Sequence, residues 1–283
     1  MNLKLSVLSA LVVAAIGVAA LRWPSGPVNA NETKSGHPVL AEDVLDILRA
    51  GNERYVSGQA EHRNSSPRRV AETAAGQVPF VTVLSCSDSR VPVENVFDRG
   101  IGDVFVVRVA GNVSTPGTAG SVEYGVAHLN TPVLVVMGHT SCGAVTAAAS
   151  GAEIKGPIDS LLAPIRPSVV EAQRKDPRAE GASLVNLAVR GNVLTTIAAL
   201  LEASPETRAR VVDGRCTVVG AVYDLATGRV EWLGEPPAIA ALRVSGQVGG
   251  PDAPQTSFDA TEARVRGRRT TDRTVGTQSK RGH

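Results

Sequence analysis

Three side chains with an affinity for soft metals follow two apolar segments of this sequence. Cys86 comes directly after residues 80–85, and His139 and Cys142 come just after residues 132–137. Both segments are short, apolar and rich in β-branched residues, which predicts buried strands. If the two strands are parallel neighbours, their carboxyl ends meet at one edge of a sheet, where α/β folds bind ligands. The three side chains are therefore expected to converge at that edge.

Two thiolates and one imidazole make a donor set that suits zinc in a tetrahedral arrangement. His139 and Cys142 are close enough in sequence to bind one ion from the start of a single helix. Three protein ligands leave the fourth position open, which distinguishes a catalytic zinc from a structural one. A water bound there has its pKa lowered toward about 7, which gives a nucleophile at neutral pH.

Two charged residues follow Cys86 closely enough to act on that nucleophile. Asp88 can accept a hydrogen bond from the zinc-bound hydroxide, and Arg90 can hold Asp88 through a bidentate pair. Two alternatives stay open at this point. Asp88 could itself be a fourth ligand that closes the site, or Cys86 and Cys142 could form a disulfide, as cysteines of exported proteins often do. Cys216 has no partner motif and is expected to be a buried free thiol.

The central part of the chain alternates the strands and helices that must position these residues. Its strands are continuous apolar runs rather than alternating ones, as a parallel sheet covered on both faces requires. The sequence therefore predicts the α/β class, with a mainly parallel central β-sheet flanked by helices. Strands are expected at residues 80–85, 104–107, 132–137, 217–223 and 230–233, and helices at residues 40–56, 118–129, 142–150, 161–175 and 184–203.

The first thirty residues have the pattern of a secretory signal peptide. Lys4 precedes the apolar residues 5–21, and residues 28–30, Val-Asn-Ala, fit the small-x-small pattern of a cleavage site. The alternatives are a core helix or a retained single-span anchor, for which the apolar segment is at the lower limit of length. We expect a secreted or periplasmic protein that contacts a membrane only through this segment if it is not cleaved.

The domain organisation follows from these boundaries. Residues 1–30 are the expected signal peptide, 31–39 a linker, 40–235 the catalytic domain and 236–283 a basic, low-complexity, disordered tail. The tail is rich in Pro, Gly, Ser, Thr and Arg and has too little apolar surface to offset the entropy of ordering. The net charge of +2 is too small to indicate a nucleic-acid partner.

The two metal-binding segments resemble a known signature pair. Residues 86–91, Cys-Ser-Asp-Ser-Arg-Val, together with residues 138–143, Gly-His-Thr-Ser-Cys-Gly, are similar to the motifs of β-class carbonic anhydrases. The similarity extends over residues 48–233 and includes Phe-Val-Val-Arg-Val-Ala-Gly-Asn at 105–112. The resemblance implies a zinc enzyme that reversibly hydrates carbon dioxide to bicarbonate and a proton.

The resemblance also implies a role for each matching residue. Cys86, His139 and Cys142 match the ligands of one zinc ion per subunit, and Asp88 with Arg90 matches a catalytic dyad that orients the nucleophile. Members of the family assemble as homodimers or larger multiples, in which each site is formed from two chains. Three further residues match substrate-binding positions: Gln77, Phe105 and Tyr124. Of these, Gln77 and Tyr124 could serve the neighbouring subunit's zinc.

Two other functions use the same residues. Proteins that resemble this family hydrolyse carbonyl sulfide or carbon disulfide with the same zinc ligands, and the shape of the pocket decides the substrate. A non-catalytic zinc or redox protein is the other alternative. It predicts either a closed four-ligand site or a disulfide between Cys86 and Cys142.

Overall fold

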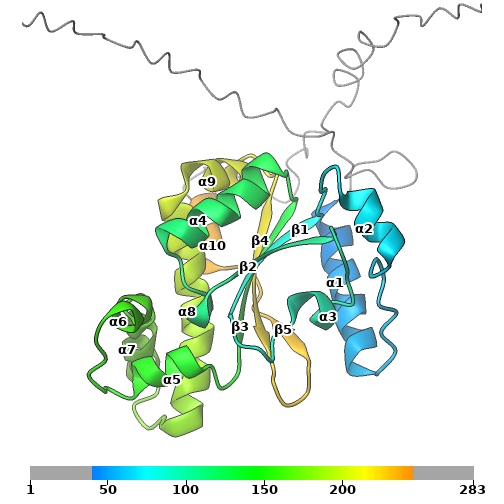
Figure 1. The fold of residues 1–283 in the computed structure, drawn as a ribbon. Coiled ribbons are helices and arrows are strands. Elements are labelled where there is room, and N and C mark those ends of the chain that lie inside the picture. The colour runs from blue at the N-terminus through cyan, green and yellow to red at the C-terminus, as the bar shows by residue number, and fades with distance from the viewer. Residues whose placement is uncertain (1–39, 245–283) are drawn as a thin grey trace, which may run out of the picture.

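The computed structural model describes residues 40–244, in which five strands form one sheet of order β2-β1-β3-β4-β5 (Figure 1). The first four strands are parallel, and β5 pairs antiparallel with β4. The predicted α/β class is confirmed. The expected signal peptide and linker lie outside the described residues. The strands are β1 (Val81–Ser85), β2 (Val104–Arg108), β3 (Val133–His139), β4 (Thr217–Tyr223) and β5 (Val230–Trp232).

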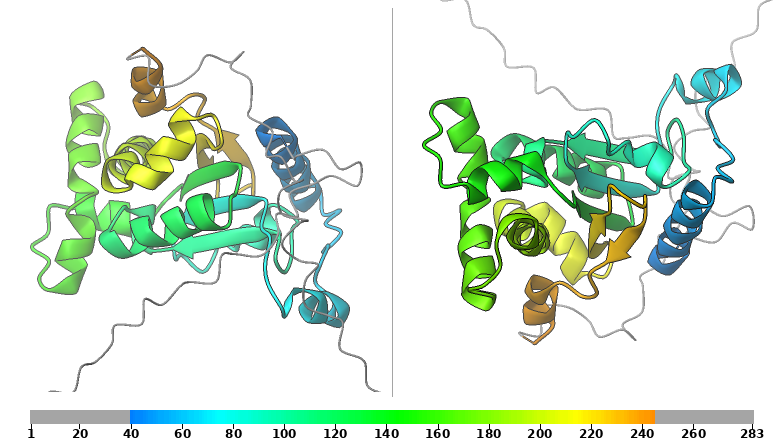
Figure 2. Two further views of the ribbon diagram at one scale, coloured as in Figure 1. Left: turned by 90° about the horizontal axis from the view of Figure 1, so that it is seen from above. Right: turned by 90° about the horizontal axis from the view of Figure 1, so that it is seen from below.

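Helices cover both faces of the sheet (Figures 1 and 2). One face carries α1 (Ala41–Val56) and α3 (Val93–Val96), and the other carries α8 (Gly181–Ala203) and α4 (Pro116–Glu123). The sheet is therefore a middle layer that is shielded on both sides. The other helical segments are α2 (Pro67–Thr73), the 3₁₀ turn η1 (Ala110–Asn112), the π-helical turn η2 (Tyr124–His128), α5 (Gly143–Ala149), α6 (Pro157–Leu162), α7 (Arg166–Lys175), α9 (Pro205–Val212) and α10 (Pro237–Val244).

The apolar side chains of the strands contribute to two separate hydrophobic cores, one on each face of the sheet. Successive side chains of a strand point to opposite faces, so Val81 and Val83 of β1 join the cluster on the α1 side. Leu84 and Cys86 join the cluster on the α8 side. Every residue of β1 is buried. A strand with both faces covered is mainly apolar, and the buried hydroxyl of Thr82 within β1 is hydrogen-bonded to Thr131.

Helix α8 is the central element of the second core. It packs against β3 and β4, and its buried residues recur along its whole length. Among the described residues, it is the single helix long and apolar enough to cross a membrane by length and composition alone. In this fold 56% of its most apolar window is buried. Its apolar composition is therefore that of a helix that packs in the core of a globular domain.

Several helices begin with a hydroxyl residue followed by proline. Ser66, Thr115 and Ser204 each accept a hydrogen bond from a backbone amide in the first turn of α2, α4 and α9. Proline fits the next position because the amide it lacks has no partner inside a helix. Helix α4 consequently begins before residue 118, where the apolar pattern predicted its start. The sequence prediction missed α2 and α9 altogether, although the same start signal precedes them.

Two other predicted boundaries were wrong. The helix expected at residues 161–175 is divided into α6 and α7, because Pro164 and Pro167 remove amide donors and clash with a preceding turn. The domain expected to end at residue 235 also continues beyond it. Residues of the expected tail form α10, and Ile239 is only 5% exposed, packed in the core on the α8 side. The rest of the tail lies outside the described residues.

The close packing of α1 on α3 predicts a large effect for a small substitution. A Cβ atom at Gly51 would lie 1.9 Å from the backbone oxygen of Phe97. We expect Gly51→Ala to reduce the free energy of unfolding by about 2–3 kcal/mol, since backbone must move to relieve the clash. Thermal unfolding followed by circular dichroism measures the effect.

Gly191→Ala is the matched control, because Gly191 is also helical and its nearest neighbour would be 3.5 Å away. It should leave stability unchanged or raise it by up to about 1 kcal/mol, as alanine has the higher helix propensity. Equal effects of the two substitutions would contradict the packing argument.

Candidate functional site

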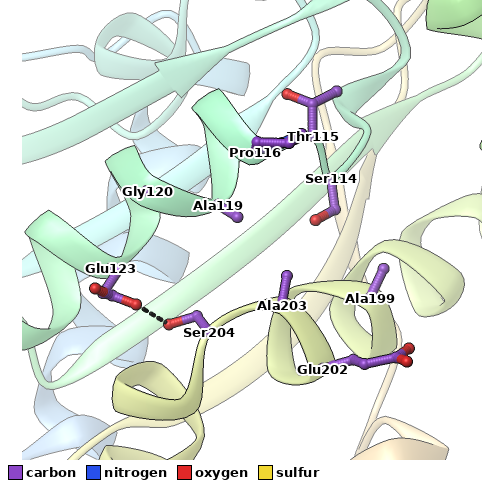
Figure 3. Close-up of a pocket in the computed structure, with 10 residues that line it drawn as sticks. All are labelled: Ser114, Thr115, Pro116, Ala119, Gly120, Glu123, Ala199, Glu202, Ala203 and Ser204. Carbon is purple, nitrogen blue, oxygen red and sulfur yellow. Dashed lines mark hydrogen bonds between the residues drawn. The ribbon is translucent and has the colours of Figure 1, made fainter.

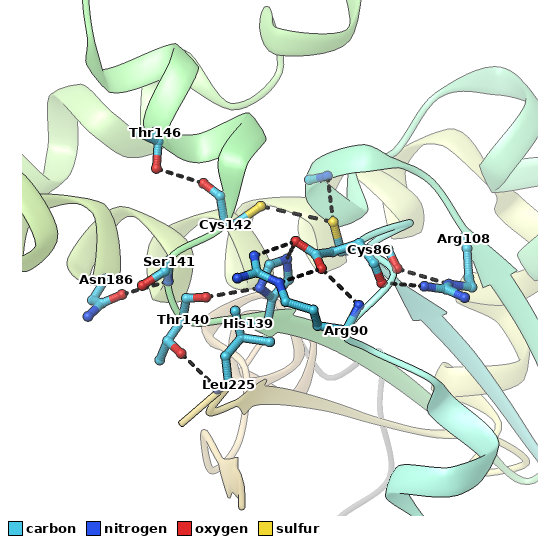
Figure 4. A network of polar contacts seen from close by, with 12 residues as sticks. Cys86, Arg90, Arg108, His139, Thr140, Ser141, Cys142, Thr146, Asn186 and Leu225 are labelled. Atoms are coloured by element: carbon cyan, nitrogen blue, oxygen red, sulfur yellow. Dashed lines mark hydrogen bonds and ion pairs between the residues drawn. The ribbon is translucent and has the colours of Figure 1, made fainter. Parts of the chain in front are cut away.

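The register of the sheet brings the three predicted donor residues together. Ser85 of β1 lies opposite Met137 of β3, so Cys86 follows β1 at the edge where His139 ends β3. Cys142 follows the next turn, at the start of α5. The two sulfurs and an imidazole nitrogen all lie within 4.8 Å of one another, and all three side chains are buried (Figure 4). The predicted convergence is therefore present.

The two sulfurs form a tightly coupled pair. Their Sγ atoms are 4.0 Å apart, and both cysteines are free thiols, so the predicted disulfide alternative is not present. The hydrogen bond from the Cys142 thiol, joined by a contact with His139, lowers the pKa of Cys86 to about 4. The backbone amide of Gly111 also donates to the Cys86 sulfur, at 3.3 Å. Cys86 is thus held as the anionic member of the pair.

Cys142 caps the amino end of α5. Its carbonyl oxygen accepts both the backbone amide and the hydroxyl of Thr146, each at 2.9 Å. The neighbouring Cys86 sulfur and burial raise the pKa of Cys142, although the amides of Ala144 and Val145 act in the opposite direction. Two buried sulfurs this close do not both carry negative charge without a nearby cation. A divalent cation between them would stabilise both thiolates.

The imidazole of His139 is oriented as a metal ligand would be. Its Nδ1 lies 2.9 Å from the backbone oxygen of Thr140, which can only accept, so Nδ1 carries the proton. The lone pair is then on Nε2, a buried atom without a hydrogen-bond partner. A buried acceptor left without a partner is costly unless something else satisfies it. Two sulfurs and this nitrogen suit zinc in donor type and number.

Asp88 and Arg90 form the bidentate pair that the sequence predicts. Arg90 donates from Nε to Oδ1 at 2.9 Å and from its terminal nitrogen to Oδ2 at 2.8 Å, and its backbone amide also bonds Oδ1 at 3.0 Å. The Arg90 guanidinium holds the pKa of Asp88 well below its usual range. Oδ2 of Asp88 also lies 3.8 Å from Nε2 of His139. An ionised carboxylate therefore stands beside the three donors.

Arg108, at the end of β2, fixes the loop that carries these residues. Its guanidinium donates to the backbone oxygens of Cys86 at 3.0 Å and Asp88 at 2.6 Å (Figure 4). Neither Arg108 nor Gly111 was among the site residues predicted from the sequence. Both lie in the segment 105–112 that carries part of the family resemblance, which is the signal that could have indicated them.

The three predicted substrate-binding residues do not join this cluster. Gln77 is exposed and precedes β1, at the opposite end of the strand from Cys86. Phe105 lies on β2, and its ring is 5.8 Å from that of Tyr124, which in turn lies 5.6 Å from the ring of His128. Phe105 and Tyr124 thus form a half-buried aromatic group near the edge strand. Gln77 thus lies away from the donors of its own chain, and Phe105 packs against the core on the α8 side that also includes Cys86 and Cys142.

A separate groove lies between α4 and the end of α8 (Figure 3). It has a volume of about 610 Å³, and none of the sulfur or imidazole donors lines it. At its margin Ser204 donates a hydrogen bond to Glu123 at 2.6 Å. The side chains that could do chemistry are therefore gathered at the edge of the sheet and not in this groove.

Comparison with known proteins identifies similar chains. The family described as carbonic anhydrase matches residues 81–230. Carbonic anhydrase 2 of Mycobacterium tuberculosis (strain ATCC 25618 / H37Rv) is 40% identical over 186 residues, which is 64% of this chain and 87% of that protein. The carbonic anhydrase of Mycolicibacterium smegmatis is 38% identical over 201 residues, which is 70% of this chain and 94% of that protein.

Solved structures show the same similarity in three dimensions. A structure described among two tetrameric β-carbonic anhydrases of Sordaria macrospora has a TM-score of 0.56 and 28% identity, and the match covers 68% of this chain and 98% of that one. A β-carbonic anhydrase of Aspergillus fumigatus has a TM-score of 0.54 and 28% identity, and the match covers 74% of this chain and all of that one.

The bidentate pair predicts how Asp88 titrates. Because its pKa lies below the value of about 3.9 for an unfolded aspartate, the pair contributes stability above pH 3.9, and this contribution is lost as the pH falls through the lower folded value. We expect Arg90→Gln to raise the pKa of Asp88 toward about 3.9. The carboxyl carbon shift of Asp88, followed by NMR from pH 7 downward, measures this. The same midpoint in both proteins would show that Arg90 is not the cause.

Proposed function

Because the chain belongs to the β-class carbonic anhydrases, we propose that it hydrates carbon dioxide reversibly at a zinc ion held by Cys86, His139 and Cys142. The observation that carries the proposal is the buried cluster of two sulfurs and one imidazole with the Asp88–Arg90 pair beside it. When bound, zinc supplies a nucleophile at neutral pH because it lowers the pKa of a coordinated water to about 7.

Asp88 is proposed to orient that nucleophile. An ionised carboxylate only accepts hydrogen bonds, so it can fix the direction of an O–H group beside the donor set. Arg90 occupies both carboxylate oxygens from the solvent side and keeps Asp88 ionised. This pairing supports the open site over the alternative in which Asp88 is the fourth ligand, because it holds both carboxylate oxygens on the Arg90 guanidinium.

The other functions considered from the sequence have no support in the comparisons. The family and the relatives described above are carbonic anhydrases, and none is described as a hydrolase of carbonyl sulfide or carbon disulfide. A non-catalytic zinc or redox protein has no use for a carboxylate held by an arginine next to the donor set. The carbonic anhydrase reaction uses each of these groups.

The decisive test is zinc content together with the rate of carbon dioxide hydration for wild type and Asp88→Asn. The wild type should hold one zinc ion per chain, with a rate that rises through one ionisation between pH 6.5 and 9. Asp88→Asn should keep zinc but lower kcat by about 10²-fold or more, the size of effect that a misplaced reacting group produces.

Asp46→Asn is the matched control, because Asp46 also pairs with an arginine but lies exposed on α1. Its rate should equal that of the wild type. A zinc-loaded wild type without hydration activity would refute the proposed function, and full activity of Asp88→Asn would refute the role of Asp88.

We also propose a homo-oligomer in which Gln77, Phe105 and Tyr124 line the neighbouring chain's site. Tetrameric assembly is described for the Sordaria macrospora enzymes. In support, β1 spans about 17 Å between the loop of Gln77 and Cys86, so Gln77 is too distant from the donors of its own chain. Phe105 lies on β2, whose outer edge pairs with no other strand of the described residues. A second copy placed at that edge would complete the pocket.

Complementation between inactive chains tests this arrangement. Gln77→Ala should lower activity by about 10- to 100-fold, as expected for the loss of a hydrogen bond to a charged group. A mixed dimer of Gln77→Ala and Asp88→Asn chains would contain one complete site. Random assortment of equal amounts in a two-fold dimer should therefore restore about a quarter of the wild-type activity. No recovery after the chains are unfolded and refolded together would show that Gln77 does not act across subunits.

A further inference from the structure

One helix is hydrogen-bonded to both loops that surround the donor set. Asn192 of α8 donates from Nδ2 to the backbone oxygen of Gly111 at 2.7 Å. Asn186 of the same helix accepts through Oδ1 the backbone amide of Ser141 at 3.2 Å (Figure 4). Helix α8 packs directly on β3 and β4 in the core. It is therefore a rigid support that reaches both loops.

The first bond acts on the sulfur of Cys86. Gly111 donates its amide to that sulfur and gives its carbonyl to Asn192, so the residue is fixed on both sides. Its φ of 73° is in the left-handed region, where glycine is favoured, and a Cβ there would lie 2.6 Å from the side chain of Ile165. Because the conformation of Gly111 sets the directions of its amide and its carbonyl together, the bond from Asn192 to the carbonyl also restrains the amide that points at the sulfur.

The second bond acts on the segment that joins the other two donors. Ser141 lies between His139 and Cys142 and has a φ of 54°, which residues with side chains rarely adopt. Asn186 accepts the amide of Ser141 in this conformation. The turn at Ser141 determines how the imidazole and the Cys142 sulfur are placed relative to each other. Asn186 is half-buried, so its substitution leaves the core intact.

The environment of Asn192 argues against a purely structural role. It is 1% exposed and is surrounded along α8 by apolar neighbours such as Val189 and Val193. Its carbonyl oxygen is buried without a hydrogen-bond partner. A buried amide that is only half satisfied is less favourable for folding than an apolar side chain of similar size. The bond to Gly111 is the interaction that Asn192 makes and a leucine could not.

We propose that Asn186 and Asn192 are positioning residues that hold the two sulfurs and the imidazole in their metal-binding arrangement before the ion arrives. Asn192 acts through the amide of Gly111 on Cys86, and Asn186 acts through Ser141 on His139 and Cys142. Groups that orient metal ligands in this way commonly change metal affinity by about 10- to 100-fold. The proposal rests on the zinc site described under the proposed function, and it adds the elements that preorganise that site.

The test compares zinc affinity among variants by competition with a chelator of known affinity. Asn192→Leu and Asn186→Leu should each bind zinc about 10- to 100-fold more weakly than wild type. Asn186→Asp keeps an oxygen acceptor for the amide of Ser141 and should restore affinity to near the wild-type value. This rescue separates the hydrogen bond from the packing of the side chain.

Cobalt substitution gives a readout that a loss of stability alone does not change. The sulfur-to-cobalt charge-transfer band depends on the electron density at each sulfur, which a donated hydrogen bond lowers. Asn192→Leu should shift this band to lower energy, because the amide of Gly111 is no longer held on Cys86. Asn186→Leu should leave that component in place, since Ser141 donates to neither sulfur.

Thr195→Val is the control on the same helix. Thr195 hydrogen-bonds Ser168 of α7 at 3.2 Å and contacts neither loop of the site, so its zinc affinity and cobalt spectrum should match wild type. Wild-type affinity in both leucine variants would overturn the proposal, as would weaker binding in Thr195→Val equal to theirs. If Asn192→Leu does not fold, the zinc affinities of Asn186→Leu and Asn186→Asp still test the proposal, because the first should be weakened and the second restored. A wild type that binds no zinc would instead refute the proposed function itself.

Discussion

The parallel pairing of β1 with β3 is the constraint on which the rest of the site depends. Because both strands run in the same direction, the residues that follow them emerge at the same edge, and the register places Ser85 beside Met137. Cys86 and His139 therefore approach each other although they are far apart in the sequence. A parallel sheet has to be covered on both faces, which explains the two helical layers and the continuous apolar strands. The parallel arrangement of the strands therefore accounts for both the cluster of donors at the edge of the sheet and the buried core.

Charge at this edge is arranged so that the groups support one another. Cys86 is anionic beside the Cys142 thiol, and the carboxylate of Asp88 is balanced by Arg90. The backbone around them supplies further donors, since Gly111 bonds the sulfur and Arg108 bonds the carbonyls of the loop. Charges and dipoles that are already in place need little rearrangement during a reaction. This preorganisation is the main source of electrostatic catalysis in enzymes.

The sequence predicts those features that depend on neighbouring residues. Short apolar runs followed by Cys86 and by His139 indicate both the strands and the donor set, and Asp88 lies close enough to Arg90 for their pairing to be predicted. Contacts between distant residues leave no such local pattern. Asn192 and Gly111 are 81 positions apart, and an asparagine within an apolar helix gives no sign of the carbonyl it will meet. Helices α2 and α9 were missed for another reason, because their Ser-Pro starts are local signals that hydrophobic periodicity does not detect.

The outer edge of β2 has a consequence for how the chain must be produced. Val104, Phe105 and Val106 are half-buried, β2 carries no proline, and its one charged residue, Arg108, lies at its end, where it bonds the loop of Cys86. Unprotected edges of this kind promote aggregation, and proteins normally cover them. If copies of the chain associate through this edge, assembly is also a protection for the folded monomer. Correct assembly of newly made chains then competes with aggregation through their exposed β2 edges. The concentration of the chain in the cell therefore affects how much of it reaches the native assembly.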